Sequence, residues 1–146
     1  MRRVVITGMG TVNPLGKNVE EFWANIKANK NGLSYVDQFD TENFPVKIVG
    51  AVKDFDCTEY IDKKEAKRMD RFTQFAVCSA KQALKMAGSD FKDVDPFKAG
   101  VIIGVGIGGL NMTEKEGGAL IRSWNSPECL PGRNIRKNQV GLIDDI

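Results

Sequence analysis

The cationic side chains with the most suggestive spacing lie within six residues, at Lys63, Lys64, Lys67 and Arg68. On a helix, Lys64, Lys67 and Arg68 are related by steps of three and four residues, so they share one face. A solvated helix surface is the ordinary interpretation of such a run. The functional alternative is a docking surface for a phosphorylated or otherwise acidic partner. The spacing by itself leaves both interpretations open.

A second motif is glycine-rich and spans residues 104–109, Gly-Val-Gly-Ile-Gly-Gly. It follows an apolar segment and precedes a predicted helix, as the dinucleotide-binding fingerprint does. An acid that could bind a ribose is expected on a second strand, whereas Glu128 lies in a proline-flanked segment. Two alternatives remain: the glycines permit a positive φ and a tight contact, or they present Ile107, the large side chain between them, to a cavity.

The residues that could act as nucleophiles or bases are few. The chain has three cysteines, Cys57, Cys78 and Cys129, and no histidine. Without histidine the chain cannot build a Ser-His or Cys-His pair or a histidine-type zinc site. The odd cysteine count and the absence of a CxxC motif argue against a disulfide framework and favour a reducing compartment. We therefore predict no catalytic residue and no metal site within these residues.

Length and composition fit one soluble domain or part of a larger one. The chain has 146 residues, of which 42% are hydrophobic and 27% charged, with a net charge of +2. This charge does not argue for nucleic acid as a partner. No apolar run approaches the roughly 20 residues that cross a bilayer, and the N-terminal apolar run is too short for a signal peptide. We expect a cytoplasmic protein with no membrane partner.

The pattern of elements predicts an α/β fold with a parallel sheet. The expected strands are residues 4–6, 98–104 and, as a short one, 47–52. The expected helices begin after the caps Asn18, Asp62 and Asp70 and cover about 112–121, with stops at Asn31-Gly32 and at Gly88. A turn is expected at residues 8–10. Loops pinned to the core are expected at Phe39, Phe44 and Phe55.

Four segments together resemble the β-ketoacyl-[acyl-carrier-protein] synthases, in particular the elongating type II enzyme of fatty acid synthesis. They are residues 2–16, 39–40 with 52–55, 68–76 and 103–110. The likeness runs from Arg2 to about Ile121. It implies a partial thiolase-like fold, part of the first βαβα half of a layered αβαβα architecture. It also implies a homodimer and no cofactor.

The resemblance implies an acyltransferase activity, in which an acyl thioester condenses with malonyl-carrier protein and carbon dioxide is released. The catalytic cysteine and two histidines of the family match no position here, and Cys129 does not lie in the nucleophile motif. What the resemblance carries over is peripheral. Lys64, Lys67 and Arg68 match basic positions that receive the acyl carrier protein, and Ile107 matches a residue that lines the acyl pocket.

The likeness is lost near Arg122. We therefore divide the chain into residues 1–122, the N-terminal part of a synthase domain, and 123–146, a divergent and irregular tail. A truncated or frame-shifted product is our hypothesis for this change. The chain is then a fragment of a synthase that is inactive alone, with apolar surface left exposed. The alternative is a non-catalytic module that binds carrier protein or a dimer partner.

Overall fold

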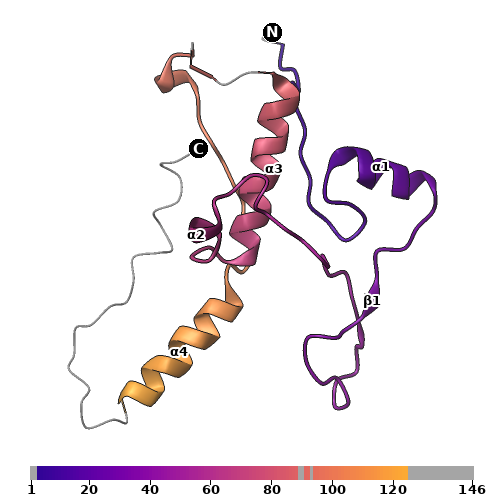
Figure 1. Cartoon of the computed structure of the whole chain (residues 1–146), viewed down its shortest axis with the longest axis vertical. Helices are drawn as coiled ribbons and strands as arrows, with labels where there is room; N and C mark the ends of the chain where they lie inside the picture. The colour runs from indigo at the N-terminus through magenta and orange to yellow at the C-terminus, as the bar shows by residue number, and fades with distance from the viewer. Residues whose placement is uncertain (1–2, 89–90, 93, 125–146) are drawn as a thin grey trace. The chain divides into compact units, whose positions relative to one another are not determined.

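The structure is a computed structural model that describes residues 3–88, 91–92 and 94–124. The chain divides into two compact units, which are described separately. The first contains residues 1–69 and 73–91, and the second contains residues 70–72 and 92–146. Figure 1 labels the helices and the first strand. The predicted tail at 123–146 lies outside the described residues from position 125 onward.

Helix α1 spans Val19–Lys27 and begins where the capping pattern predicts. The Asn18 side chain accepts a hydrogen bond from the Glu21 backbone nitrogen at 2.8 Å. Glu21 in turn accepts from the Lys17 backbone nitrogen at 2.8 Å, so one free donor of the first turn and one just before the cap are satisfied. The predicted stop at Asn31-Gly32 is wrong, because the helix ends earlier and Asn29 takes the left-handed conformation with φ 53°.

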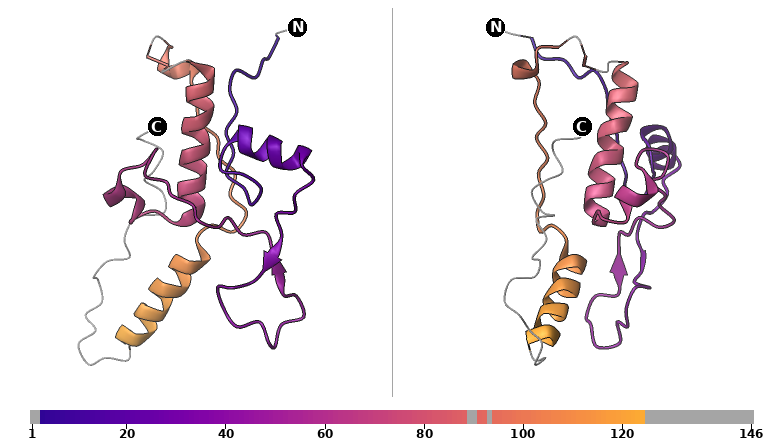
Figure 2. Two further views of the ribbon diagram at one scale, coloured as in Figure 1. Left: turned by 45° about the vertical axis from the view of Figure 1, so that its right-hand side comes forward. Right: turned by 60° about the vertical axis from the view of Figure 1, so that its left-hand side comes forward.

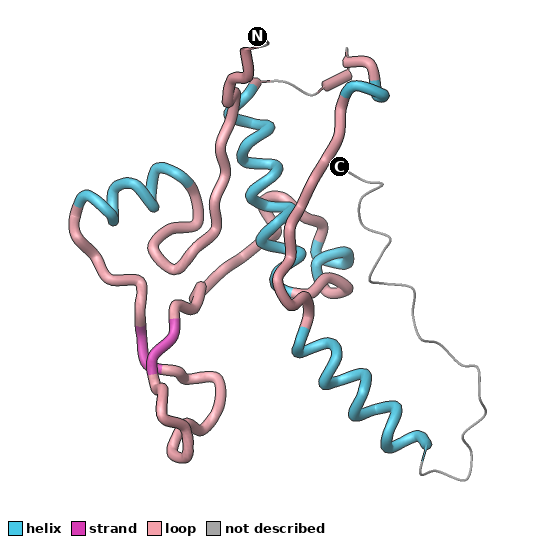
Figure 3. The backbone as a smooth tube through the Cα atoms, turned by 180° about the vertical axis from the view of Figure 1, so that it is seen from behind, coloured by secondary structure: helices cyan, strands magenta, loops and turns pink. Residues whose placement is uncertain are grey.

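A small antiparallel hairpin follows, formed by β1 (Ser34–Tyr35) and β2 (Ile48–Val49), which appear in magenta in Figure 3. It confirms a short strand within 47–52. The predicted anchoring of two loop phenylalanines is wrong: Phe39 and Phe44 are 57% and 53% exposed and stack on each other, edge to face, at 5.6 Å. Phe55 does reach the core, where its ring lies 5.0 Å from that of Phe75.

Two helices follow the hairpin, α2 (Lys63–Ala66) and α3 (Arg71–Ala87). The Asp62 side chain caps α2 by accepting from the Lys64 backbone nitrogen at 2.8 Å, as predicted. Helix α3 begins directly after Asp70 and ends at Gly88, whose φ of 66° confirms the predicted glycine stop. The local capping signals therefore place both helices correctly.

The N-terminal segment runs alongside α3, as Figures 1 and 2 show. A Cβ atom at Gly8 would overlap the Ala83 carbonyl oxygen, and one at Gly10 would overlap the Ser79 carbonyl oxygen. The predicted turn at residues 8–10 is therefore wrong. These residues are in a loop without a turn, and their glycines allow close backbone contact with the helix.

The prediction of a first strand at residues 4–6 is also wrong. Val4 and Ile6 are 94% and 84% exposed, and the segment pairs with no strand among the described residues. An apolar run forms a strand only where a neighbouring strand accepts its backbone hydrogen bonds. Since β1 and β2 form the whole two-stranded sheet found in the described residues, the expected parallel sheet is not formed there.

The hydrophobic core of the first unit is small and gathers around α3. Its buried residues are Cys57, Ile61, Ala66, Val77 and Cys78. Cys78 is fully buried, and this burial, together with a smaller effect of the nearby Cys57, raises the pKa of its thiol to about 11. Both of these cysteines are free thiols.

In the second unit, the prediction of a strand at residues 98–104 is wrong. Residues 96–98 form a 3-10 helix, η1 (Pro96–Lys98), and the apolar residues after it have no strand partner, with Ile102 99% exposed. The expected helix is present and longer, as α4 (Leu110–Trp124). Among the described residues, the helices are all too short or too polar to cross a membrane.

We predict that Gly10→Ala destabilises the first unit. The new methyl group would overlap the Ser79 carbonyl oxygen, which belongs to helix backbone and cannot move aside freely. Forced overpacking of this kind costs about 1–3 kcal/mol. Urea unfolding followed by circular dichroism should show a lower midpoint. Gly104→Ala is the matched control, because a Cβ there has nothing within 4 Å, and an equal midpoint for the two variants would contradict the prediction.

We also predict that Cys78 resists alkylation below about pH 10. The thiolate is the reactive species, and with a pKa of about 11 only about one Cys78 thiol in a thousand is ionised at pH 8. Iodoacetamide labelling followed by peptide mass spectrometry should therefore show slow modification at pH 8, faster modification as the pH rises, and rapid modification in urea. Labelling of the folded chain at the unfolded rate would show that the thiol is neither buried nor shifted.

Candidate functional site

The predicted cationic side chains lie together in the first unit, on and just after α2. Lys64 belongs to the helix, Lys67 is its C-cap, and Arg68 follows in the next turn. All three side chains are exposed, while Ala66 between them is buried in the core. The apolar side of this short helix is therefore anchored and its cationic residues face water.

The charges of this basic cluster, defined as Lys64, Lys67 and Arg68, are available for a partner. None of the three forms an ion pair or a side-chain hydrogen bond with another residue of the described ranges. Lys63 differs, because its charge contributes to lowering the pKa of Asp56, after the larger effect of the hydrogen bond from the Thr58 backbone nitrogen. Exposed unpaired cations of this kind are suited to bind an acidic surface.

Ile107 lies in the second unit, just before α4, and is 79% exposed. It lies between Gly106 and Gly108. A Cβ added at Gly106 would meet nothing within 4 Å, and Gly108 has a φ of 81°. The positive φ at Gly108 agrees with the predicted conformational use of a glycine there. Gly109 is different, because a Cβ there would overlap the Asp70 carboxylate. The turn thus presents Ile107 on an open loop.

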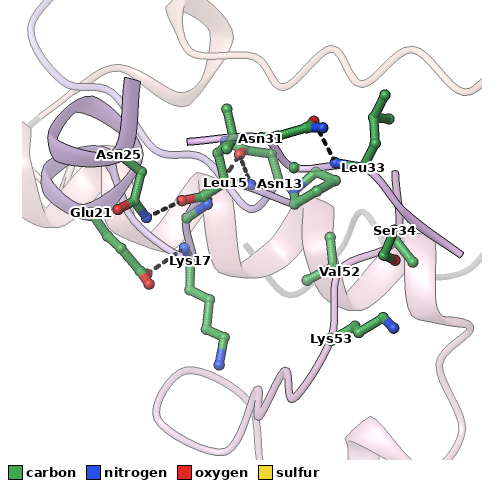
Figure 4. Close-up of a pocket in the computed structure, with 14 residues that line it drawn as sticks. Asn13, Leu15, Lys17, Glu21, Asn25, Asn31, Leu33, Ser34, Val52 and Lys53 are labelled. Carbon is green, nitrogen blue, oxygen red and sulfur yellow. Dashed lines mark hydrogen bonds between the residues drawn. The ribbon is translucent and has the colours of Figure 1, made fainter. Parts of the chain in front are cut away.

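A polar hollow of about 270 Å³ lies elsewhere in the first unit, between α1, the loop before it and the base of the hairpin (Figure 4). Its polar groups bond within the protein: Asn25 donates to the Leu15 carbonyl at 2.6 Å, and Lys17 Nζ donates to the Asp54 carbonyl at 2.6 Å. Lys53 pairs with Asp37 at 2.6 Å, which lowers the pKa of that carboxyl. None of the predicted site residues lines this hollow.

The described residues do not assemble a nucleophile with a base. Cys78 is fully buried and Cys57 is 7% exposed, and the burial of Cys78 opposes formation of its thiolate. Cys129 lies outside the described residues. The described ranges also contain no cluster of three or more side chains that could hold a metal ion. What the geometry offers is a group of exposed cationic side chains in one unit and an exposed apolar side chain in the other.

Comparison with known proteins shows which family the chain resembles. The sequence model of the family described as "Beta-ketoacyl synthase, N-terminal domain" matches residues 1–135. The match continues past residue 122, where the sequence analysis places the start of the divergent tail.

Three curated relatives are proteins named 3-oxoacyl-[acyl-carrier-protein] synthase 2. The one from Synechocystis is 40% identical over 130 residues, the one from Vibrio harveyi 42% over 120, and the one from Staphylococcus aureus (strain N315) 45% over 113. These alignments cover 89%, 82% and 77% of this chain but 31%, 29% and 27% of the relatives. The chain therefore spans about 30% of the length of the curated relatives that it matches.

Two solved structures are also similar. The ishigamide ketosynthase/chain length factor has a TM-score of 0.66 and 32% identity, with 80% of this chain and 30% of that chain covered. A ketosynthase solved in complex with its type II acyl-carrier protein has a TM-score of 0.64 and 28% identity, with 84% and 33% covered. They confirm the expected fold class, a partial thiolase-like α/β fold. The chain belongs to the β-ketoacyl synthase family and corresponds to its N-terminal domain.

Proposed function

We propose that the chain is the N-terminal portion of a 3-oxoacyl-[acyl-carrier-protein] synthase. The parent activity is the decarboxylative condensation of an acyl thioester with malonyl-carrier protein in fatty acid biosynthesis. The observation that carries this proposal is the 40–45% identity to curated synthases over most of the chain. The boundaries at 1–122 and 123–146, a cytoplasmic location and a homodimer belong to the same proposal.

This chain alone is expected to be inactive. The condensation needs an ionised thiol that accepts the acyl group and groups that stabilise the charge of the reacting thioester. The chain has no histidine, and its two described cysteines are buried thiols. Its own residues serve binding, through the basic cluster and through Ile107.

We assign the basic cluster to docking of the acyl carrier protein. The three exposed, unpaired cations support this assignment. Further support comes from the related ketosynthase, which was solved in complex with an acyl-carrier protein. Charges on a fixed helix end steer an acidic partner and set its orientation more than they add affinity, so the contact is expected to be transient and sensitive to salt.

Ile107 is assigned to the acyl pocket. Its exposed side chain sits on an open glycine-flanked loop, which leaves about four-fifths of its surface free to contact an acyl chain. The second candidate function, a non-catalytic module that binds carrier protein or a dimer partner, is favoured by the same basic cluster. It differs from the first in that the chain serves binding only and is not part of a condensing enzyme.

We predict that Lys64→Glu and Arg68→Glu each weaken binding of the acyl carrier protein by about fivefold at low salt. Each reversal replaces an attraction with a repulsion, and exposed charge pairs contribute up to about 1 kcal/mol. Fluorescence anisotropy of labelled carrier protein measures the affinity. Lys30→Glu is the matched control, since Lys30 is an exposed lysine beyond the end of α1 and outside the basic cluster.

Two outcomes would count against this assignment. If Lys30→Glu weakens binding as much as Lys64→Glu, the effect is one of net charge and the basic cluster has no special role. If the unsubstituted chain binds no carrier protein, both the docking assignment and the module alternative fail. An elongation assay with acyl- and malonyl-carrier protein completes the test, because turnover by the purified chain would disprove the expected inactivity.

For Ile107, we predict that Ile107→Asp weakens binding of a dansyl-labelled fatty acid by about tenfold. Burying an isoleucine side chain is worth about 1.5–3 kcal/mol, which a carboxylate cannot supply. Titration followed by dansyl fluorescence gives the affinity. Ile102→Asp is the control, because Ile102 is 99% exposed in the same unit and has no assigned role. Equal losses in the two variants would indicate unspecific adhesion and remove Ile107 from the pocket.

A further inference from the structure

The basic cluster stands on an element that is too short to be stable by itself. Helix α2 has four residues, which is close to the minimum for one helical turn, and formation of such a turn is unfavourable without external support. Its first turn is capped by Asp62. Its last carbonyl groups accept from the turn that follows, Glu65 from the Arg68 backbone nitrogen at 2.8 Å and Ala66 from the Met69 backbone nitrogen at 3.2 Å.

Gln74, in the first turn of α3, adds a side-chain donor to the carbonyl groups of this turn. Its side-chain nitrogen donates to the Ala66 carbonyl oxygen at 2.8 Å and lies 3.3 Å from the Met69 carbonyl oxygen. These two carbonyls belong to the residues on either side of Lys67 and Arg68. The Gln74 side chain is partly buried, so water replaces it poorly as a donor.

We propose that Gln74 is the positioning residue of the carrier-docking surface. The inference rests on the proposed function, since it concerns the same basic cluster. Gln74 touches the backbone of the turn that carries Lys67 and Arg68, and it acts on the carrier protein only through that turn. Together with the Asp62 cap and the buried Ala66, it fixes the turn at three points, at its start, its middle and its end.

This restraint matters for binding because docking costs the entropy of ordering the surface. The cationic side chains are long and remain mobile, so the restraint lies in the backbone that carries them. A turn that is already held in one conformation presents its charges at fixed spacing before the partner arrives. A frayed turn would have to order during binding, and the affinity would fall without the loss of any charge.

The chemistry of the contact also selects glutamine. Two carbonyl oxygens lie within reach of the side chain, and its amide nitrogen has two N–H groups to offer. A glutamate at neutral pH would present only acceptors to these oxygens, and a methionine of similar length would present no donor. Gln74→Met therefore removes both hydrogen bonds while it keeps the size of the side chain.

The test compares Gln74→Met with Gln82→Met in the full chain. Gln82 is a matched control, because it lies on the same helix and its amide also makes two bonds to backbone, to Thr11 and Lys17. Both variants should lower the urea midpoint. Under native conditions, anisotropy with labelled carrier protein should show a three- to tenfold loss of affinity for Gln74→Met and no loss for Gln82→Met.

A second measurement separates positioning from general weakening. In the Lys64→Glu/Arg68→Glu background, Gln74→Met should cause little further loss of affinity, because residues that act through one contact are not additive. Unchanged binding in Gln74→Met, or an equal loss in Gln82→Met, would overturn the positioning role and leave the docking assignment intact. Absence of binding by the unsubstituted chain would overturn both.

Discussion

The first unit depends on one buried side chain, Gln82 of α3, which is 8% exposed. Its oxygen accepts from the Thr11 backbone nitrogen at 3.1 Å, and its nitrogen donates to the Lys17 carbonyl oxygen at 2.7 Å. These bonds hold both ends of the turn at residues 13–16 against α3. Since α1 begins directly after this turn, its position follows from the same contact. An unpaired amide at this site would cost about 1–3 kcal/mol for each lost partner.

Polar contacts to backbone recur throughout this unit because, among the residues that the structure describes, its hydrophobic core has only five buried members. The Lys81 side chain donates to the Tyr60 carbonyl oxygen at 2.8 Å, and Lys17 does the same for Asp54 at 2.6 Å. Gln74 holds the turn after α2 in the same way. Long polar side chains thus tie loops to helices where apolar burial is scarce. The apolar surface that stays exposed, at Val4 for example, agrees with the expectation for part of a larger fold.

This construction has a consequence for the basic cluster. The backbone of α2 is held by its cap, by Ala66 in the core and by Gln74, whereas the cationic side chains themselves extend into water. A surface of this kind combines fixed spacing of charges with local adaptability. It suits a partner that is attracted from a distance, oriented and then released. That behaviour is what the proposed docking of an acyl carrier protein requires.

The chain by itself determined the elements whose signals are local. Asn18 and Asp62 cap the helices that they were expected to cap, Gly88 ends α3, and Lys64, Lys67 and Arg68 are exposed. The ordered motifs also identified the family, which the comparisons confirm. The caps and the helix stop depend on residues a few positions apart, so the sequence alone contains both partners of each contact.

Tertiary structure decided the features that need a partner far away along the chain, namely strand pairing, close backbone contacts and the hydrogen bonds of buried side chains. The segments 4–6 and 98–104 have strand-like composition, but a strand also needs a neighbour that sequence composition does not supply. The use of Gly8 and Gly10 became visible only beside α3, and so did the tasks of Gln74 and Gln82. The sequence did contain a signal for these two glutamines. Each lies four residues from the buried Cys78, and on a helix this spacing places both amides near the buried face. Which backbone groups those amides bind is a matter of three-dimensional proximity, because their partners lie up to 71 residues away along the chain.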